Sequence, residues 1–375
     1  MAKRITSAPP VLAGYSYVRP LGSGGFADVF LYEQDMPRRV AAVKVLLADA
    51  VNTEVLRAFN VEADISARLS AHPSIVTIYQ ASISSDGRPY FAMEYCPDNM
   101  SARYKKTPLS LIEVLDTGVR IAGALETVHR AGLLHRDIKP SNVLINALGA
   151  PVLADFGIAA AVVDEGDPET FAMSVPWSAP EVLQEKVSGS IPSEVWSLGA
   201  TLYTLLAGRS PFERPDRESN SREQLTQRIV RARYTALPMS GVPAIIDEIL
   251  ATAMDRDPAR RFPSMAAFAE RLRWAQYELG ITPTAFEAAS AEWAAAAPVS
   301  FSDSGPRGPV ITTVDPNSRR AARAAKEAPH PRDRDDLPTT SRRRSPMTAG
   351  LIGAAVGAVV IAGVGVTALM LTGVI

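Results

Sequence analysis

The segment His135-Arg136-Asp137-Ile138-Lys139-Pro140-Ser141-Asn142 is followed thirteen residues later by Asp155-Phe156-Gly157, and these two stretches decide the fold. They place a carboxylate, a lysine, an amide and a second carboxylate in a fixed order. In phosphoryl transfer, a carboxylate orients an attacking hydroxyl, a lysine neutralises charge on the moving group, and oxygen ligands hold a metal ion against the phosphates. No packing rule demands this spacing, so the two stretches predict phosphoryl-transfer chemistry.

The two segments resemble the catalytic motifs of the eukaryotic-like, or Hanks-type, serine/threonine protein kinases of bacteria. The resemblance covers about residues 15–279 and implies an α+β, two-lobe protein-kinase fold. A small β-rich N-lobe is expected at about 15–95 and a large α-rich C-lobe at about 96–280. Hydrophobic spacing agrees with this order. It predicts helices at 53–70, 109–131, 192–208, 221–231, 242–255 and 264–279.

The resemblance assigns a role to each polar residue of these motifs. Asp137 is expected to be the catalytic base and Lys139 the partner of the phosphoryl charge. Asn142 and Asp155 are expected to bind the Mg²⁺ that accompanies ATP, with Mn²⁺ as an alternative metal. His135 is expected to be a core residue rather than a proton carrier.

A glycine-rich segment lies near the start of the expected domain. Without side chains, glycines let backbone N–H groups approach phosphates. An ordinary β-turn and a dinucleotide-binding turn are alternatives, although the latter would open a helix, whereas residues 29–32 continue as a strand. The resemblance makes the segment an ATP-binding loop in which Ala27 replaces the third glycine. Its candidate nucleotide-binding residues are Leu21, Gly22, Ser23, Gly24, Gly25, Phe26, Ala27, Asp28 and Val29.

Lys44 ends the apolar run Ala41-Ala42-Val43, where an ammonium group needs a charged partner unless it reaches the surface. The resemblance supplies two partners, the α- and β-phosphates of ATP and Glu62 on the helix of the N-lobe. The alternative is a surface lysine and a solvated glutamate.

The run Met93-Glu94-Tyr95-Cys96 resembles the segment that joins the two lobes. Glu94 and Cys96 are therefore candidates to bind the adenine of ATP, and Met93 would close the back of the pocket. A plain buried strand is equally compatible with these side chains.

Arg136 and the residues after Asp155 carry expected control features. Arg136 precedes the base, which in this family often marks activation by phosphorylation. Thr170 is predicted to be an autophosphorylation site. Ser174 replaces a threonine that contacts the catalytic loop in the family, so it is expected to be structural.

The segment Ala179-Pro180-Glu181 has a predicted partner, because Glu181 is expected to form an ion pair with Arg261. Three positions depart from the family pattern. Met173 replaces a glycine, Trp177 a tyrosine and Glu194 an aspartate. These positions concern the floor that binds a substrate peptide and the anchoring of the catalytic loop, so they leave peptide preference and basal rate open.

Composition limits the other functions. The chain has 375 residues, 47% of them hydrophobic, which is enough for a large core. The net charge of −1 gives no overall field for binding nucleic acid. Cys96 is the single cysteine, which excludes an intramolecular disulfide and fits a reducing compartment.

The terminal regions are expected to lie outside the catalytic domain. Residues 1–14 are expected to be a tail without a signal peptide. Residues 281–347, rich in Ala, Pro and Arg, are expected to be a mostly disordered juxtamembrane linker, although 284–297 could form one more helix. Residues 348–375 contain no charged side chain and predict a single transmembrane helix.

The arginine triplet at 342–344 precedes this apolar stretch. Because basic residues flank the cytoplasmic side of membrane spans, we expect a single-pass protein of the cell membrane. Its kinase domain would be cytoplasmic and its C-terminus at or beyond the outer face. Gly353 and Gly357 have a spacing that would allow a homodimer, but glycines are abundant here and the spacing also arises by chance.

The sequence thus predicts a membrane-anchored enzyme that phosphorylates serine and threonine hydroxyls of protein substrates. A catalytically silent kinase fold acting as a membrane scaffold is the first alternative, but such proteins usually lose Lys44, Asp137 or Asp155. A small-molecule kinase or ATP-dependent sensor is the second, but it would lack the segment 179–181 and Arg261.

Overall fold

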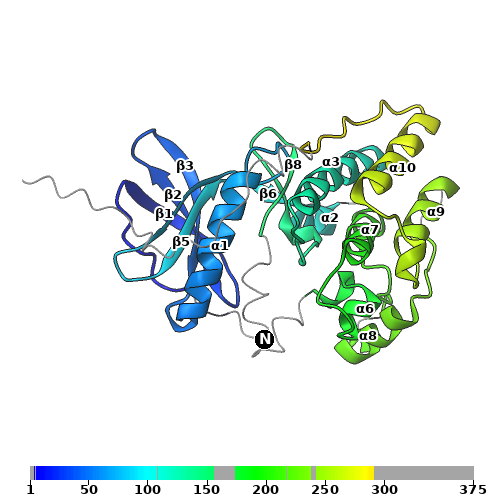
Figure 1. Cartoon of the computed structure of the whole chain (residues 1–375), viewed down its shortest axis with the longest axis horizontal. Coiled ribbons are helices and arrows are strands. Elements are labelled where there is room, and N and C mark those ends of the chain that lie inside the picture. Colours follow the sequence, from blue (N-terminus) through cyan, green and yellow to red (C-terminus); the bar gives the residue numbers. More distant parts are fainter. Residues whose placement is uncertain are drawn as a thin grey trace, which may run out of the picture. The chain divides into compact units, whose positions relative to one another are not determined.

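The computed structural model describes residues 4, 6–107, 109–155, 174–216, 218–237 and 242–290. All of them belong to one compact unit of the chain. Within it, a β-rich lobe is followed by a larger helical lobe (Figure 1). Both the expected N-lobe and the expected C-lobe are therefore present.

The N-lobe is an antiparallel five-stranded sheet with one long helix packed against it. The strands lie in the order β1-β2-β3-β5-β4. Their bounds are β1 Tyr15–Ser23, β2 Ala27–Gln34, β3 Arg39–Leu46, β4 Ile78–Ile83 and β5 Pro89–Glu94, and the helix is α1 Thr53–Leu69. Asn52 caps α1 by accepting a hydrogen bond from the Val55 N–H at 2.8 Å.

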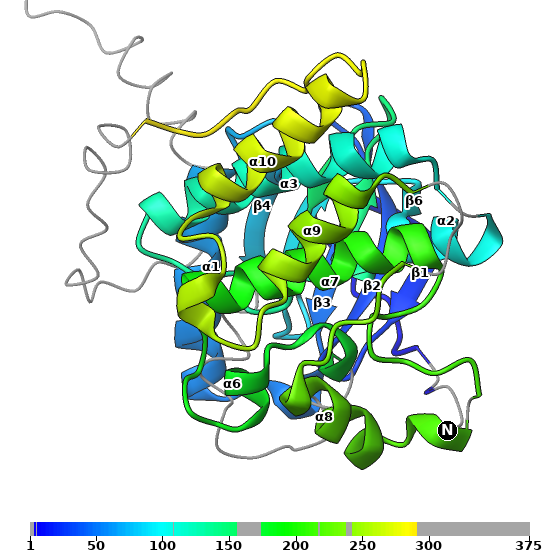
Figure 2. The ribbon, with the colours of Figure 1, turned by 90° about the vertical axis from the view of Figure 1, so that its right-hand side faces the viewer.

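The C-lobe is built around α3 and α7, which lie next to each other in Figures 1 and 2. A small sheet, β6-β7-β8, covers the end that faces the N-lobe. The elements are β6 Asp98–Asn99, α2 Met100–Lys106, α3 Leu111–Arg130, β7 Val143–Ile145, β8 Pro151–Leu153, α6 Pro180–Leu183, α7 Ile191–Ala207, α8 Arg222–Arg231, α9 Ala244–Ala253 and α10 Met265–Glu278. The six helices predicted from hydrophobic spacing are thus confirmed.

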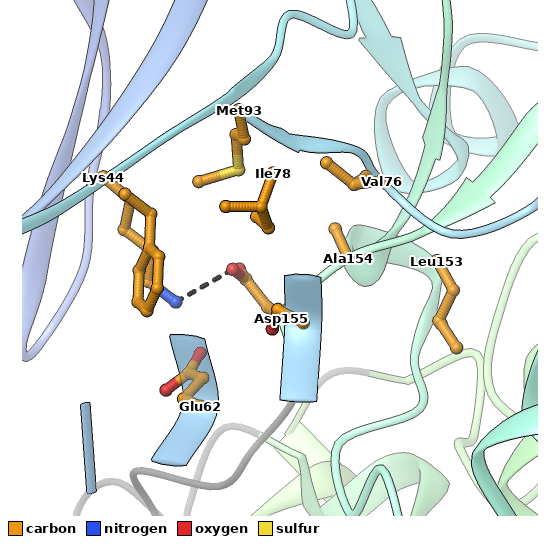
Figure 3. A pocket seen from close by; sticks show the side chains of 10 residues that line it. Lys44, Glu62, Val76, Ile78, Met93, Leu153, Ala154 and Asp155 are labelled. Atoms are coloured by element: carbon orange, nitrogen blue, oxygen red, sulfur yellow. Dashed lines mark hydrogen bonds and ion pairs between the residues drawn. The ribbon is translucent and has the colours of Figure 1, made fainter. Parts of the chain in front are cut away.

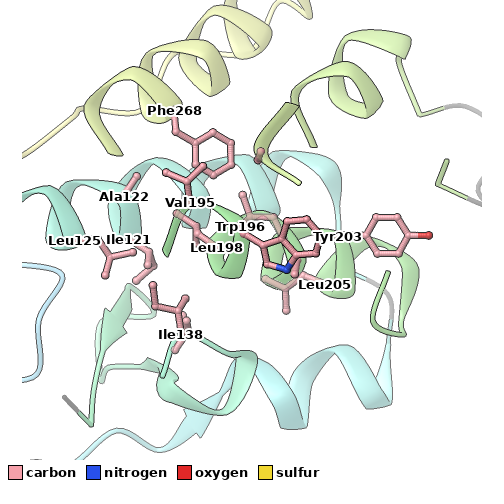
Figure 4. Close-up of a cluster of buried hydrophobic side chains, with 14 of the residues drawn as sticks. Ile121, Ala122, Leu125, Ile138, Val195, Trp196, Leu198, Tyr203, Leu205 and Phe268 are labelled. Carbon is pink, nitrogen blue, oxygen red and sulfur yellow. The ribbon is translucent and has the colours of Figure 1, made fainter. Parts of the chain in front are cut away.

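Local sequence explains where the central helix α7 begins and ends. Ser190 and Ser193 form a reciprocal capping box at its start. At its end, Gly208 adopts a left-handed conformation with φ of 72°, which favours a residue without a Cβ atom. Trp196 and Leu198 on α7 belong to one continuous apolar cluster that also contains residues of α3 and α10 (Figure 4). This cluster fixes the frame that carries the catalytic loop.

Both ends of the described chain differ from the expectation of free tails. Leu12 is buried against the outer face of the N-lobe sheet, and Tyr32 Oη donates a hydrogen bond to the Pro10 carbonyl at 2.6 Å. Residues 281–290 pack along α3 without helical structure, so the ordered region extends ten residues past the expected boundary at 280. The helix considered for 284–297 is therefore absent over 284–290.

No helix within the described ranges is both long enough and apolar enough to span a membrane. The transmembrane helix predicted at 348–375 lies outside those ranges. Most of the linker, the arginine triplet and the glycine pair also lie outside them.

Candidate active site

A pocket lies between the N-lobe sheet, α1 and the end of β8 (Figure 3). Lys44 of β3 and Glu62 of α1 reach it from the N-lobe, and Asp155 reaches it from just beyond β8. The remaining walls are largely apolar. They are formed by Ser66, Val76, Ile78, Phe91, Met93, Leu153 and Ala154.

Lys44 makes an ion pair with Asp155, with 2.9 Å between Nζ and Oδ1. Burial opposes the charged ammonium, but the charges of Asp155 and Glu62 raise the pKa of Lys44 above its usual value. The Lys44 charge in turn holds the pKa of Asp155 below its usual range. Both groups are therefore ionised at neutral pH.

Glu62, the expected partner of Lys44, is buried beside this pair but acts on Lys44 through electrostatics alone. Burial raises the pKa of Glu62 to about 7, although the Lys44 charge lowers it. Among the side chains that the structure describes, the hydrogen bond of Lys44 goes to Asp155. The expected ion pair between Lys44 and Glu62 is therefore not formed in this structure.

Asp137 stands at the centre of a hydrogen-bonded group in the catalytic loop. Its Oδ1 accepts from Ser174 Oγ at 2.5 Å, and its Oδ2 lies 2.7 Å from Lys139 Nζ and accepts from Asn142 Nδ2 at 2.9 Å. Lys139 also donates to Ser174 Oγ at 3.0 Å. The predicted contact between Ser174 and the catalytic loop is thus confirmed.

The charge state of Asp137 follows from these contacts. Burial tends to raise its pKa, but Lys139 and Ser174 together hold the pKa of Asp137 below the usual value for an aspartate. The side chain is therefore a fixed carboxylate that can accept a hydroxyl hydrogen bond. His135 is fully buried, and burial lowers its pKa, which agrees with a core role.

Arg136, next to Asp137, and Asp155 itself adopt left-handed backbone conformations, with φ of 66° and 60°. Such non-glycine conformations persist only where neighbouring contacts hold them. The Arg136 N–H donates to Glu194 Oε1 at 2.6 Å, and Glu194 Oε2 lies 2.6 Å from His129 Nε2. The glutamate that replaces an aspartate therefore still anchors the catalytic loop backbone.

The glycine-rich segment forms the turn between β1 and β2, where the Gly24 N–H donates to the Ala27 carbonyl at 2.8 Å. Leu21 and Val29 pack with the apolar cluster on the pocket side of the sheet. Leu21, Gly22 and Ser23 end β1, Gly24, Gly25 and Phe26 make the turn, and Ala27, Asp28 and Val29 begin β2.

Asp28 does not share the orientation of its neighbours, because successive side chains of a strand point to opposite faces. It lies on the face of Phe30 and Tyr32, away from the pocket cluster. Its buried carboxylate accepts from the Ser7 N–H at 2.8 Å and is paired with Arg4. The side chain thus binds the N-terminal segment rather than lining the pocket, and no periodic pattern in the sequence predicts this contact.

The segment joining the lobes follows β5. Met93 is buried and lines the pocket, and Glu94 pairs with Ala41 of β3. Cys96 is partly buried next to the pocket-side cluster, and burial raises the pKa of its thiol to about 12. The thiol is therefore protonated at neutral pH, and the assignment of Glu94 and Cys96 to adenine binding stays a prediction.

Asn142 and Asp155 provide oxygen donors of the kind that Mg²⁺ prefers. Asn142 Nδ2 donates to the backbone carbonyl and the side chain of Asp137, both at 2.9 Å, which leaves its Oδ1 as the candidate metal ligand. In the described part of the chain, no group of three His, Cys, Asp or Glu side chains could hold a metal ion. Asn142 and Asp155 would thus supply only part of the coordination of a metal ion, and phosphates and water would supply the rest.

The segment after Ser174 is tied to the C-lobe. Arg261 Nη1 and Nη2 donate to the two carboxylate oxygens of Glu181 at 2.6 and 2.8 Å, which confirms the predicted ion pair. Trp177 Nε1 donates to Thr204 Oγ1 of α7 at 3.0 Å, so the tryptophan fixes this segment to the central helix. Thr170 and Met173 lie outside the described residues.

Comparisons with known proteins agree with this geometry. A family model described as a protein kinase domain matches residues 15–272. The serine/threonine-protein kinase PknK of Mycobacterium tuberculosis is 38% identical over 279 residues, which cover 72% of this chain and 24% of PknK. PknJ of the same species is 34% identical over 287 residues, 72% of this chain and 47% of PknJ.

A more distant relative is the serine/threonine-protein kinase PrkC of Bacillus subtilis, 32% identical over 254 residues, which cover 66% of this chain and 38% of PrkC. The chain thus spans between about a quarter and a half of the length of these curated relatives. The family match over residues 15–272 extends across both lobes and spans the catalytic loop.

Proposed function

The chain belongs to the protein kinase domain family, among the Hanks-type serine/threonine kinases of bacteria, and on that premise we propose that it transfers the γ-phosphoryl group of ATP to serine and threonine hydroxyls of proteins. Kinases of this family use ATP with a divalent metal. The observation that carries the proposal is the joining of Asp137, Lys139 and Asn142 in one hydrogen-bonded group at 2.7 to 2.9 Å.

In the proposed reaction, Asp137 accepts a hydrogen bond from the substrate hydroxyl and directs its oxygen toward the γ-phosphorus. The new P–O bond forms as the bond to the β-phosphate oxygen breaks, and the hydroxyl proton passes to Asp137. Lys139 neutralises charge on the moving group. When bound, Mg²⁺ supplies positive charge at the phosphates, and Asn142 and Asp155 are the residues that would hold it.

Lys44 would exchange its contact with Asp155 for the α- and β-phosphates. This exchange would free an Asp155 carboxylate oxygen for the metal.

We further propose that the enzyme works at a membrane, with Thr170 as an autophosphorylation site. The apolar residues 348–375 and the preceding arginines support the membrane anchor and a cytoplasmic kinase domain. Arg136, which stands next to Asp137, supports the phosphorylation site, because its guanidinium group could pair with a phosphate.

The silent scaffold is not favoured, because Lys44, Asp137 and Asp155 are all present; Lys44 forms an ion pair with Asp155, and Asp137 forms one with Lys139. Incubation with labelled ATP and a generic protein substrate tests the proposal. Asp137→Asn should lower transfer by about 10²–10⁴-fold while nucleotide binding persists. Asp49→Asn, at an exposed position, is the matched control. Wild-type protein that binds ATP but transfers no label would contradict the proposal.

A further inference from the structure

Residues 281–290 leave α10 and run back along α3 as an extended strap, drawn in yellow in Figures 1 and 2. The strap lies beyond the end of the family match at 272. Thr284 Oγ1 donates to Asp116 Oδ1 at 2.9 Å, and the Ala289 N–H donates to Thr127 Oγ1 at 3.0 Å. These bonds hold the strap to α3 at both of its ends.

The strap fits against α3 because a glycine faces it. A Cβ atom on Gly123 would lie only 2.2 Å from the Glu287 carbonyl oxygen. That distance is far shorter than any tolerated contact, so the strap backbone rests directly on the helix backbone. A side chain at Gly123 would displace it.

The same Glu287 carbonyl is bonded to a residue of the N-lobe. His72, buried in the corner between α1 and β4, places its Nε2 2.9 Å from this oxygen. Its Nδ1 accepts from the Ser74 N–H at 3.0 Å, so the Nε2 carries the proton and donates to Glu287. Burial lowers the pKa of His72, which keeps the ring in this neutral form.

The corner that contains His72 is joined by hydrogen bonds to β8, the strand that precedes Asp155. Ser74 O accepts from the Leu153 N–H at 2.9 Å, and the Val76 N–H donates to Leu153 O at 3.0 Å. Ile75 forms a parallel bridge with Leu153. Leu153 precedes Asp155 by two residues, so the position of this corner and that of the carboxylate are linked through backbone bonds.

We propose that the strap and His72 are positioning elements for Asp155. The strap carbonyl of Glu287 fixes the His72 ring, the ring fixes Ser74, and Ser74 holds Leu153 and with it the approach of Asp155 to the metal. The strap would thereby influence metal and nucleotide binding from outside the active site. This inference rests on the proposed function for its meaning in catalysis.

Two substitutions in the full-length chain break the link at different points. In His72→Asn, the Asn Oδ1 can still accept from the Ser74 N–H, but the side chain cannot reach Glu287. Gly123→Ala leaves His72 intact and displaces the strap, and alanine favours helix more than glycine does. Gly118→Ala makes the same change in α3 at a position that faces Leu202 and Leu272 rather than the strap.

The first measurement is amide hydrogen exchange of Leu153 and Val76 without nucleotide. The second is the magnesium concentration that half-saturates binding of a fluorescent ATP analogue. Exchange should become faster, and the half-saturating concentration should rise three- to tenfold, in His72→Asn and Gly123→Ala but not in Gly118→Ala. The double variant should differ little from either single one, since both break one link.

Wild-type values in His72→Asn would show that His72 acts only as a local turn residue and would overturn the proposal. If circular dichroism shows that Gly123→Ala disturbs α3, the test of the proposal rests on His72→Asn alone. Neither measurement needs phosphoryl transfer. Failure of the proposed kinase activity would therefore appear separately, as a wild-type protein that binds Mg-ATP but labels no substrate.

Discussion

The side chains of the site are held by more contacts in the C-lobe than in the N-lobe. In the C-lobe, Asp137 is held by Ser174, Lys139 and Asn142 over one continuous apolar cluster. In the N-lobe, the apolar residues divide into separate clusters on the two faces of the sheet. Among the described residues, the only hydrogen bond of the Lys44 side chain is the one to Asp155.

This difference suggests separate roles for the two lobes in catalysis and in nucleotide binding. The groups that act on the hydroxyl and the moving phosphoryl group are preorganised, which is where fixed electrostatics contribute most to rate. The groups that receive the nucleotide retain freedom to rearrange when it binds. Substitutions in the C-lobe should therefore affect stability and kcat, and those in the N-lobe should affect pH dependence and nucleotide affinity.

The largest effect is expected at the buried ion pair of the C-lobe. Arg261 is completely buried, so Arg261→Met leaves the Glu181 carboxylate without compensation and should lower the free energy of unfolding by about 3–5 kcal/mol. Urea unfolding followed by tryptophan fluorescence measures the loss. Arg103→Met breaks a pair that is about one-third exposed, 34% and 31%, and should cost about 0–1 kcal/mol. Equal losses in the two variants would contradict the expectation.

A pH-dependent effect is expected from Glu62 in the N-lobe. Its pKa is raised to about 7 in the folded protein from an ordinary 4.5, so the folded state binds the proton more tightly than the unfolded state. The stabilisation is complete below about pH 4.5 and is lost as the pH rises through 7. Relative to Glu62→Gln, the wild-type free energy of unfolding should fall by about 2–3 kcal/mol between pH 5 and 8. A difference independent of pH would refute the assignment.

Ser174 should affect kcat rather than nucleotide binding. Ser174→Ala removes hydrogen bonds to two charged groups, Asp137 and Lys139, and should lower kcat by about tenfold with an unchanged KM for ATP. Ser174→Thr keeps the hydroxyl and should retain most of the rate. Steady-state kinetics at saturating substrate compare the two variants. A threonine variant as slow as the alanine variant would argue that size, not hydrogen bonding, matters here.

The smallest effect is expected where the N-terminal segment binds the glycine-rich turn. Arg4 donates to the Gly24 carbonyl at 3.3 Å and is paired with Asp28, so Arg4→Met should loosen the turn. The KM for ATP should rise about two- to fivefold, as expected for a partly exposed pair, with kcat unchanged. Arg38→Met, which breaks an exposed pair with Glu33, is the control. The idea fails if both variants have the same KM.

Much of the fold and the centre of the site could be predicted from residue order. Helices such as α3 and α7 follow from apolar spacing, because a buried helix face repeats every three to four residues. Asp137, Lys139 and Asn142 lie within six residues, so one local loop conformation brings them together. Even the distant pair of Glu181 and Arg261 was predictable, because both residues stand in family motifs.

Contacts between segments that carry no repeating pattern could not be predicted. Asp28 stands in the glycine-rich motif, yet the side of the sheet it faces depends on strand register and on where the N-terminal segment packs. Lys44 was expected to pair with Glu62 and with the phosphates of ATP, and only the folded structure shows that its ammonium group bonds to Asp155 instead.

Residue order along this chain determined the chemistry of the catalytic loop, since its groups are close in sequence and act through local geometry. The tertiary structure alone decided the strap. The alanine-rich composition from residue 284 suggests a helix rather than an extended strap, and the backbone of the strap contacts Gly123, Thr127 and His72, which lie over 150 residues away. No pattern in the nearby sequence predicts such contacts, because they depend on the space beside Gly123 on α3 and on the Glu287 carbonyl that fills it.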